Sequence, residues 1–142
     1  MIFIWGISAE TLRGLIERVS FHSEETGFSV LRVQVTGFRD LITVVGAAPS
    51  VAAGEWLEAE GQWTVDREHG QEFKARIIRT TQPNTVEGIE KYLGSGIVRG
   101  VGPIFARRLV SAFGVNVFDI IENHPKLLLK VPGSRHFNVF LS

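Results

Sequence analysis

The sequence has no cysteine among its 142 residues. This absence excludes disulfide bonds, zinc ribbons and thiol catalysis, and it agrees with a reducing cytosol. Net charge is missing as well, because 15 Lys and Arg balance 15 Asp and Glu. A neutral chain does not coat polyanions by bulk electrostatics, although it can carry a local basic site. No stretch approaches the roughly 20 apolar residues of a membrane span, and we expect neither a signal peptide nor an anchor at the N-terminus.

Hydrophobic residues, in contrast, are plentiful. They make up 44% of the chain, with ten phenylalanines, which favours a packed core over disorder. The charge is also unevenly divided. Residues 1–81 hold 8 basic and 11 acidic side chains, whereas residues 82–142 hold 7 and 4, so the halves carry −3 and +3. Because the hydrophobic pattern changes at the same point, we predict a domain boundary at about residue 82.

The front half alternates apolar and polar residues in short segments bounded by turn residues, which is typical of strands. We expect strands over residues 12–22, 28–35, 41–47, 55–65 and 71–80, with Phe73 and Ile77 on one apolar face. Five short strands bury little as an open sheet, so we predict a closed barrel. A five-stranded oligonucleotide/oligosaccharide-binding (OB) barrel fits this count. An SH3-like barrel or a plain meander fits the pattern nearly as well.

The back half changes to helical spacing. Apolar residues recur every three or four positions in three short segments, which predicts a small all-α domain and an α+β protein overall. The first helix should be capped at its start by Asn84, with Glu87 as capping partner, and at its end by Gly94. The second should end at Gly114, and the third near His124.

A glycine motif lies between the first two of these helices. Gly100, Val101, Gly102 and Pro103, followed by Ala106, match a helix-hairpin-helix motif. Glycine lets the backbone turn tightly and approach a phosphate without interference from a Cβ atom, and the N-terminus of the next helix favours an anion. Val101 should pin the hairpin, and Ala106 should let the helices pack closely. The alternative is that the glycines only make a tight turn between packed helices.

Three arginines accompany the motif. Arg99 precedes the hairpin, and Arg107 and Arg108 follow it. We expect them to contact phosphates together with Gly100, Val101 and Gly102, without reading the base sequence. Arg107 and Arg108 also fit an ordinary solvated helix face.

Residues 12–133 resemble the N-terminal region of RecD-like ATP-dependent DNA helicases. The resemblance rests on the segments GLIERVSFHSEETGFSVLRVQVTG, ITVVGAAPSVAAGEWLEAEGQWTVDREHGQEFKA, TTQPNTVEGIEKYLGSGIVRGVGPIFARRLV and FDIIENHPKLLLKVPG. It implies an OB-fold domain and helix-hairpin-helix modules ahead of a motor that uses ATP and magnesium to unwind DNA in the 5′→3′ direction. It also implies a role in DNA repair and recombination in the bacterial cytosol and nucleoid.

The chain departs from this family in two ways. It contains no G-x-x-x-x-G-K-[ST], so we expect no enzymatic activity and no cofactor in this chain. The family's second hairpin also breaks off after Gly133. We therefore expect a fragment, or a truncated or frameshifted product. Its parts would be an extension over residues 1–10, the OB barrel over 11–81, the helix-hairpin-helix domain over 82–133 and a divergent tail over 134–142.

Further candidate residues lie in the barrel. Phe38 and Arg39, in a loop between strands, are candidates for contacting single-stranded DNA. Phe28, Trp63 and Phe73 could also stack on bases, but Phe28 and Phe73 lie on alternating apolar faces, which favours core packing for these two. The histidines His22, His69, His124 and His136 show no metal-ligand spacing, and no paired acid and base is visible, so we predict neither a metal site nor a catalytic site.

The leading hypothesis is a non-catalytic DNA-binding segment that meets single-stranded or junction DNA and the helicase motor, with no membrane and no small-molecule substrate. One alternative is a protein-interaction module that docks on the motor or on a replication partner. Another is a junction-binding protein of a different OB and helix-hairpin-helix architecture.

Overall fold

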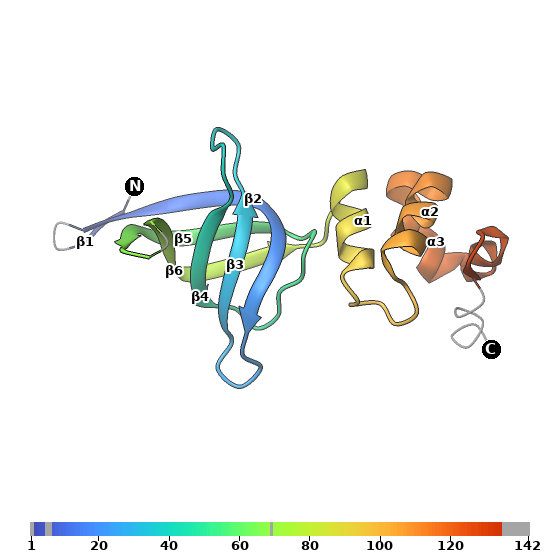
Figure 1. Ribbon diagram of the computed structural model, residues 1–142, viewed down its shortest axis with the longest axis horizontal. Coiled ribbons are helices and arrows are strands. Elements are labelled where there is room, and N and C mark those ends of the chain that lie inside the picture. The colour runs from blue at the N-terminus through green and yellow to red at the C-terminus, as the bar shows by residue number, and fades with distance from the viewer. Residues whose placement is uncertain (1, 5–6, 69, 135–142) are drawn as a thin grey trace. The chain divides into compact units, whose positions relative to one another are not determined.

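The chain forms two compact units, Met1–Gln82 and Pro83–Ser142. The computed structural model describes residues 2–4, 7–68 and 70–134 of them (Figure 1). The units divide where the sequence changes from strand-like alternation to helical spacing. The tail expected over residues 134–142 lies, apart from Ser134, outside the described residues.

The first unit is built from strands. They are β1 (Ile2–Ile4), β2 (Ile7–His22), β3 (Phe28–Gln34), β4 (Ile42–Ala47), β5 (Trp56–Asp66) and β6 (Gly70–Thr81). The strand order is β1-β2-β3-β4-β6-β5, and β2 also pairs with β5, so that β2 to β6 close into a barrel. The β4–β6 pair is parallel and the other pairs are antiparallel. This closure excludes a plain meander, and the predicted five-stranded OB-like barrel is confirmed.

Strand β2 begins five residues before its predicted start at Leu12. Residues 7–11 owe their strand conformation to partners far away in the sequence, such as Gly61, which pairs with Glu10. Local alternation does not reveal such pairing. At Gly14 the strand passes so close to β3 that a Cβ atom would lie 2.4 Å from the Gln34 carbonyl oxygen. Glycine is therefore required where β2 crosses from one neighbour to the other.

The barrel core is a single cluster of buried side chains. Its fully buried members are Ile16, Leu31, Val33, Val44, Leu57, Ala59 and Phe73. The expectation that Ile77 shares the inner face with Phe73 is wrong. Gly61 pairs with Ala75 but Glu60 pairs with Ile77, so one extra residue bulges from β6 and turns Ile78 inward instead.

The second unit is a cluster of short helices. They are α1 (Val86–Gly94), α2 (Pro103–Phe113), the 3₁₀ turn η1 (Gly114–Asn116), α3 (Val117–Asn123) and the 3₁₀ helix η2 (Pro125–Lys130). Their core consists mainly of Ile89, Leu93, Val101, Phe105, Ala106, Leu109, Val117 and Leu128. The α+β class predicted from the two halves is confirmed.

Two predicted helix ends are wrong by one residue. Thr85, not Asn84, caps α1, because its hydroxyl accepts a hydrogen bond from the Gly88 N–H at 3.1 Å. At the other end Ser95 is the capping position, and Gly94 is the last helical residue.

Among residues 2–4, 7–68 and 70–134, no helix has the length and apolar character that crossing a membrane requires.

The carboxyl group of Glu55 links the stability of the barrel to pH. Burial raises the pKa of Glu55, opposed by hydrogen bonds from Ala52 and Thr80. A carboxyl group whose pKa is higher in the folded than in the unfolded chain stabilises the fold fully at pH values below its unfolded-state pKa. That stabilisation is lost as the pH rises through its folded-state pKa. We predict that Glu55→Gln gains in free energy of unfolding relative to wild type between pH 4 and pH 7. Urea denaturation at several pH values measures this gain, with the exposed turn variant Glu24→Gln as control. A difference that is independent of pH would contradict it.

Candidate nucleic-acid interfaces

Residues 95–102 connect α1 to α2 through a tight turn (Figure 1). Gly100 has a φ of +86°, which residues with a Cβ atom rarely adopt. Its neighbour Val101 is 4% exposed and packs among core residues of both helices. The Val101 N–H donates to the Val98 carbonyl at 3.2 Å. The turn is thus held by a buried valine while the glycines on either side are exposed.

The N-terminus of α2 has no side-chain cap. Gly102 is the N-cap residue, with extended backbone, and no acidic residue lies in the first turn. A Cβ atom at Gly102 would have nothing within 4 Å, so the fold does not require glycine there. In contrast, α1 is capped by Thr85 and has Glu87 in its first turn. The start of α2 is therefore the helix end that is open to an external anion.

Close approach of the two helices fixes this geometry. A Cβ atom at Gly94 would lie 3.2 Å from Pro103 Cα and 3.7 Å from Ala106 Cβ. Ala106 itself is fully buried. Gly94 thus serves helix packing rather than the capping role expected from the sequence, and the two small residues bring the helices together at the hairpin.

The three arginines of the motif do not converge on the hairpin. Arg99 is exposed within the connecting turn and forms no ion pair with a described residue. The Arg107 Nε lies 3.3 Å from the Glu90 carboxylate. Arg108 donates from Nη1 to the Pro132 carbonyl at 3.2 Å. Of the three, Arg99 can bind an anion together with the α2 N-terminus without first breaking a contact inside the protein, whereas Arg107 and Arg108 would have to leave Glu90 and Pro132. We call Arg99, Gly100, Val101 and Gly102 the hairpin site.

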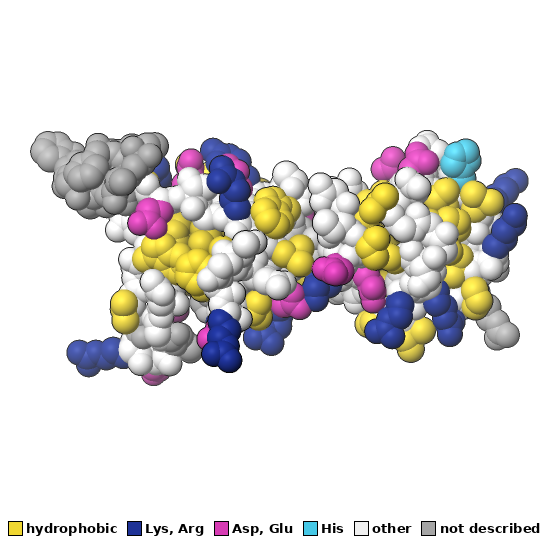
Figure 2. Space-filling model, turned by 90° about the horizontal axis from the view of Figure 1, so that it is seen from above, with side chains coloured by type: hydrophobic (Ala, Val, Ile, Leu, Met, Phe, Trp, Pro, Cys, Tyr) yellow, Lys and Arg dark blue, Asp and Glu magenta, His cyan; other side chains and the backbone are white. Residues whose placement is uncertain are grey.

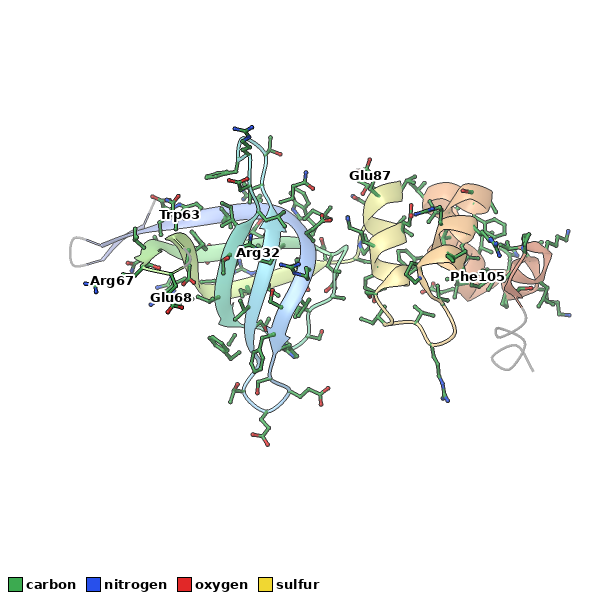
Figure 3. The ribbon with its side chains drawn as sticks, viewed as in Figure 1. Arg32, Trp63, Arg67, Glu68, Glu87 and Phe105 are labelled. Carbon is green, nitrogen blue, oxygen red and sulfur yellow. The ribbon has the colours of Figure 1, made fainter. Side chains whose placement is uncertain are left out.

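The barrel carries a second cationic surface that sequence reasoning missed. Arg18 on β2 pairs directly with Arg32 on β3, and Arg32 pairs with Thr43 on β4. The Arg32 Nη1 donates to the Thr43 hydroxyl, and the buried Arg32 Nε has no hydrogen-bond partner among the described residues (Figure 3). Like charges placed opposite each other across two strands repel, so this pair favours a bound anion.

Two exposed phenylalanines lie on the same outer surface. Phe21 pairs with Val30, one row from the arginines, and Phe28 pairs with Ala47. Their side chains are 53% and 45% exposed, and the ring centroids lie 6.2 Å apart. The expectation that Phe28 packs in the core is wrong, whereas Phe73 is fully buried as expected. We call Arg18, Phe21, Phe28, Val30, Arg32 and Thr43 the arginine face.

Irregular pairing in β2 explains why this face was missed. The register shifts twice, between Ile16 and Arg18 and between Val19 and Phe21. Each shift reverses which side of the sheet the following residues occupy. Strict alternation from the buried Ile16 would place Arg18 inside the barrel, but the first shift turns it outward. The second shift restores the alternation, so that Phe21 points outward as it would without either shift. The available signal was the pair of phenylalanines on either side of the turn at residues 23–27.

Phe38 and Arg39 lie in the exposed loop between β3 and β4. Phe38 is 44% exposed, and one side of its ring stacks on Trp63 with centroids 5.6 Å apart. Trp63, which is labelled in Figure 3, in turn meets the buried Phe73 edge-on, with the ring centroids 5.2 Å apart. Hydrophobic side chains gather over the barrel on the side where this loop projects (Figure 2). Phe38 thus anchors the loop on the barrel, while part of its ring stays exposed to solvent. Arg39, the next residue, is exposed as well.

The outer surface of β5 is occupied by ion pairs. Arg13 Nε lies 2.9 Å from the Glu58 carboxylate, and Arg79 Nη1 lies 3.6 Å from Glu58 and 3.9 Å from Glu60. Exposed pairs of this kind contribute little to stability. They do neutralise the acidic strand with cations, whereas Arg18 and Arg32 form no ion pair with any residue that the structure describes.

In the part of the chain that the structure describes, no group of three or more His, Asp or Glu side chains lies close enough together to hold a metal ion. The His22 Nδ1 lies 2.8 Å from the buried Ser29 hydroxyl. His69 and His136 lie outside the described residues.

Comparisons with known proteins agree with the barrel. Residues 9–83 match the family model described as the OB-fold domain of the ATP-dependent DNA helicase YrrC. The chain is also 31% identical over 135 residues to an ATP-dependent RecD2 DNA helicase of Deinococcus radiodurans, covering 89% of this chain. It spans 19% of that relative's length.

Proposed function

Because the chain belongs to the OB-fold domain family of YrrC, a RecD-like ATP-dependent DNA helicase, we propose that it is the segment that holds DNA for a helicase motor. The motor would follow this segment, use ATP and magnesium, and unwind DNA in the 5′→3′ direction during repair and recombination in the bacterial cytosol. The 142 residues contain no phosphate-binding G-x-x-x-x-G-K-[ST] motif, so no step of ATP hydrolysis is assigned to them.

The observation that carries the proposal is the cationic and aromatic surface of the barrel. The arginine face combines two opposed guanidinium groups with two exposed phenylalanine rings. A single strand of DNA has the complementary features, since its phosphates pair with arginine and its unpaired bases stack on aromatic rings. Duplex DNA hides its bases, so this surface favours single-stranded over double-stranded DNA.

The hairpin site adds a contact of another kind. The uncapped N-terminus of α2 and the empty space beside Gly102 favour a phosphate oxygen, and Arg99 adds a cation. Arg107 and Arg108 contribute longer-range attraction, since each is engaged by Glu90 or Pro132. Phosphates are the same in every sequence, so we expect binding that depends on salt and not on base sequence. This site accepts single strands, duplexes or junctions.

The first prediction concerns the hairpin site. Gly102→Asp places a carboxylate where the phosphate would bind, while Asp is among the best N-cap residues and the position has free space. We expect the dissociation constant for DNA to rise about tenfold or more, because a hydrogen bond to a charged group is worth about 1.5–3 kcal/mol. The melting temperature should stay equal or rise. Fluorescence anisotropy with a labelled oligonucleotide measures the affinity.

Gly102→Asn is the matched control, since Asn caps a helix equally well but carries no charge. It should bind DNA more tightly than the Asp variant. Equal affinity of the wild type and the Asp variant would remove the hairpin site from the proposal.

The second prediction concerns the arginine face. Phe21→Ala and Phe28→Ala should each weaken binding of a single-stranded oligonucleotide by about 1–3 kcal/mol, the value of one base stacked on an aromatic ring. Affinity for a duplex of the same sequence should change far less. Trp56→Ala, an exposed aromatic on β5, serves as control because it lies on the strand that carries Glu58 and Glu60. If the Trp56 variant loses as much affinity as the phenylalanine variants, the arginine face is not where the strand binds.

A further inference from the structure

An open groove of about 520 Å³ lies between α2 and η2 in the helical unit. Its floor is apolar and is formed by Ala112, Phe113, Leu127, Val131 and Pro132. The volume suits one or two side chains of a ligand. Neither the hairpin site nor the arginine face uses these floor residues. We call this feature the α2–η2 groove.

The rim of the groove is cationic. Arg107, Arg108 and Lys130 line it, and no Asp or Glu does. Lys130 is exposed at the last turn of η2 and forms no ion pair with any described residue.

Arg108 is held in place at this rim. Its Nη1 bonds to the Pro132 carbonyl, and it passes so close to Gly133 that a Cβ atom there would lie 2.9 Å from Nη1. Gly133 has a φ of +92°, a conformation that favours glycine and leaves room for the guanidinium group. One guanidinium group is therefore fixed beside the apolar floor before any ligand binds, which reduces the entropy cost of binding.

We propose that the α2–η2 groove binds a short acidic peptide segment of a partner protein, with leucine- or phenylalanine-like side chains on the floor and carboxylates at the rim. The combination of an apolar floor and three rim cations requires both features in one ligand. DNA fits less well, because it would set a charged backbone against an apolar floor. This inference concerns a protein partner and stands independently of the DNA-binding proposal.

The other possible occupant is the chain's own C-terminal stretch. Residues 135–142 have the sequence RHFNVFLS, which contains apolar side chains but no Asp or Glu. Arg135 adds a further positive charge and would be repelled by the rim. Charge complementarity therefore favours a separate acidic segment.

The test uses a short fluorescein-labelled peptide in which Asp alternates with Leu and Phe, titrated with the full chain and followed by anisotropy. One control peptide replaces Asp by Lys, and another replaces Leu and Phe by Ser. The Asp peptide should bind at least about tenfold more tightly than either control, since each control removes one of the two features that the groove recognises. Equal binding of any control peptide would overturn the proposal.

Variants then place the binding in the groove. Lys130→Glu should weaken binding of the Asp peptide roughly tenfold, because attraction becomes repulsion at the rim. Lys126→Glu is the matched control, since Lys126 belongs to the same helix η2 with the same charge but does not line the groove. Ala112→Trp should block the floor, and Ala112 is exposed, so the fold tolerates the larger side chain.

Three results would overturn the proposal. The first is an equal loss of peptide affinity in the Lys126 and Lys130 variants. The second is a chain ending at Ser134 that binds the peptide about tenfold more tightly, which would assign the groove to the chain's own tail. The third is a loss of oligonucleotide affinity in the Lys130 variant that matches its loss of peptide affinity, which would make the groove part of the DNA surface. Gly102→Asp should leave peptide affinity unchanged, so failure of the DNA proposal can be told apart from failure of this one.

Discussion

The pairing of β2 with two different strands is the constraint on which the barrel depends. One half of this strand pairs with β5 and the other half pairs with β3, which joins the two edges of the sheet. The change of partner requires Gly14, where the chains pass too closely for a Cβ atom, and two shifts of register beyond it. The first of these shifts turns Arg18 to the outer surface. The strand pairing that closes the barrel therefore also forms its candidate binding surface.

The overall charge balance conceals two local imbalances. The barrel has an excess of acidic residues, yet Arg13 and Arg79 neutralise Glu58 and Glu60 on one side of it. On β2 and β3, Arg18 and Arg32 are paired across the strands and form no ion pair with a described residue. In the helical unit, the positive excess is divided between Arg99 at the hairpin and the rim of the α2–η2 groove. Binding of anions therefore follows from where the charges lie, and net charge gives no indication of it.

Much of the fold could be predicted from the sequence, because local patterns determine it. Alternation in β5 and helical spacing around Ile89 and Leu109 correctly indicated a barrel and a helical cluster. The candidate site was harder to predict, because it depends on departures from those patterns. A single bulge exchanged Ile77 for Ile78 in the core, and the first shift in β2 brought Arg18 to the surface. Bulges arise from pairing between distant strands, which a local window of sequence does not contain.

The central claim is that DNA meets this chain at the arginine face and at the hairpin site. Backbone amide chemical shifts, recorded by NMR during titration with a single-stranded oligonucleotide, test this claim most directly. The account predicts that the largest changes cluster at Arg18, Phe28 and Arg32 and at Gly100 and Gly102, and that they diminish as salt is added. Changes confined to the β5 surface around Glu58, or no changes at a large molar excess of oligonucleotide, would contradict it.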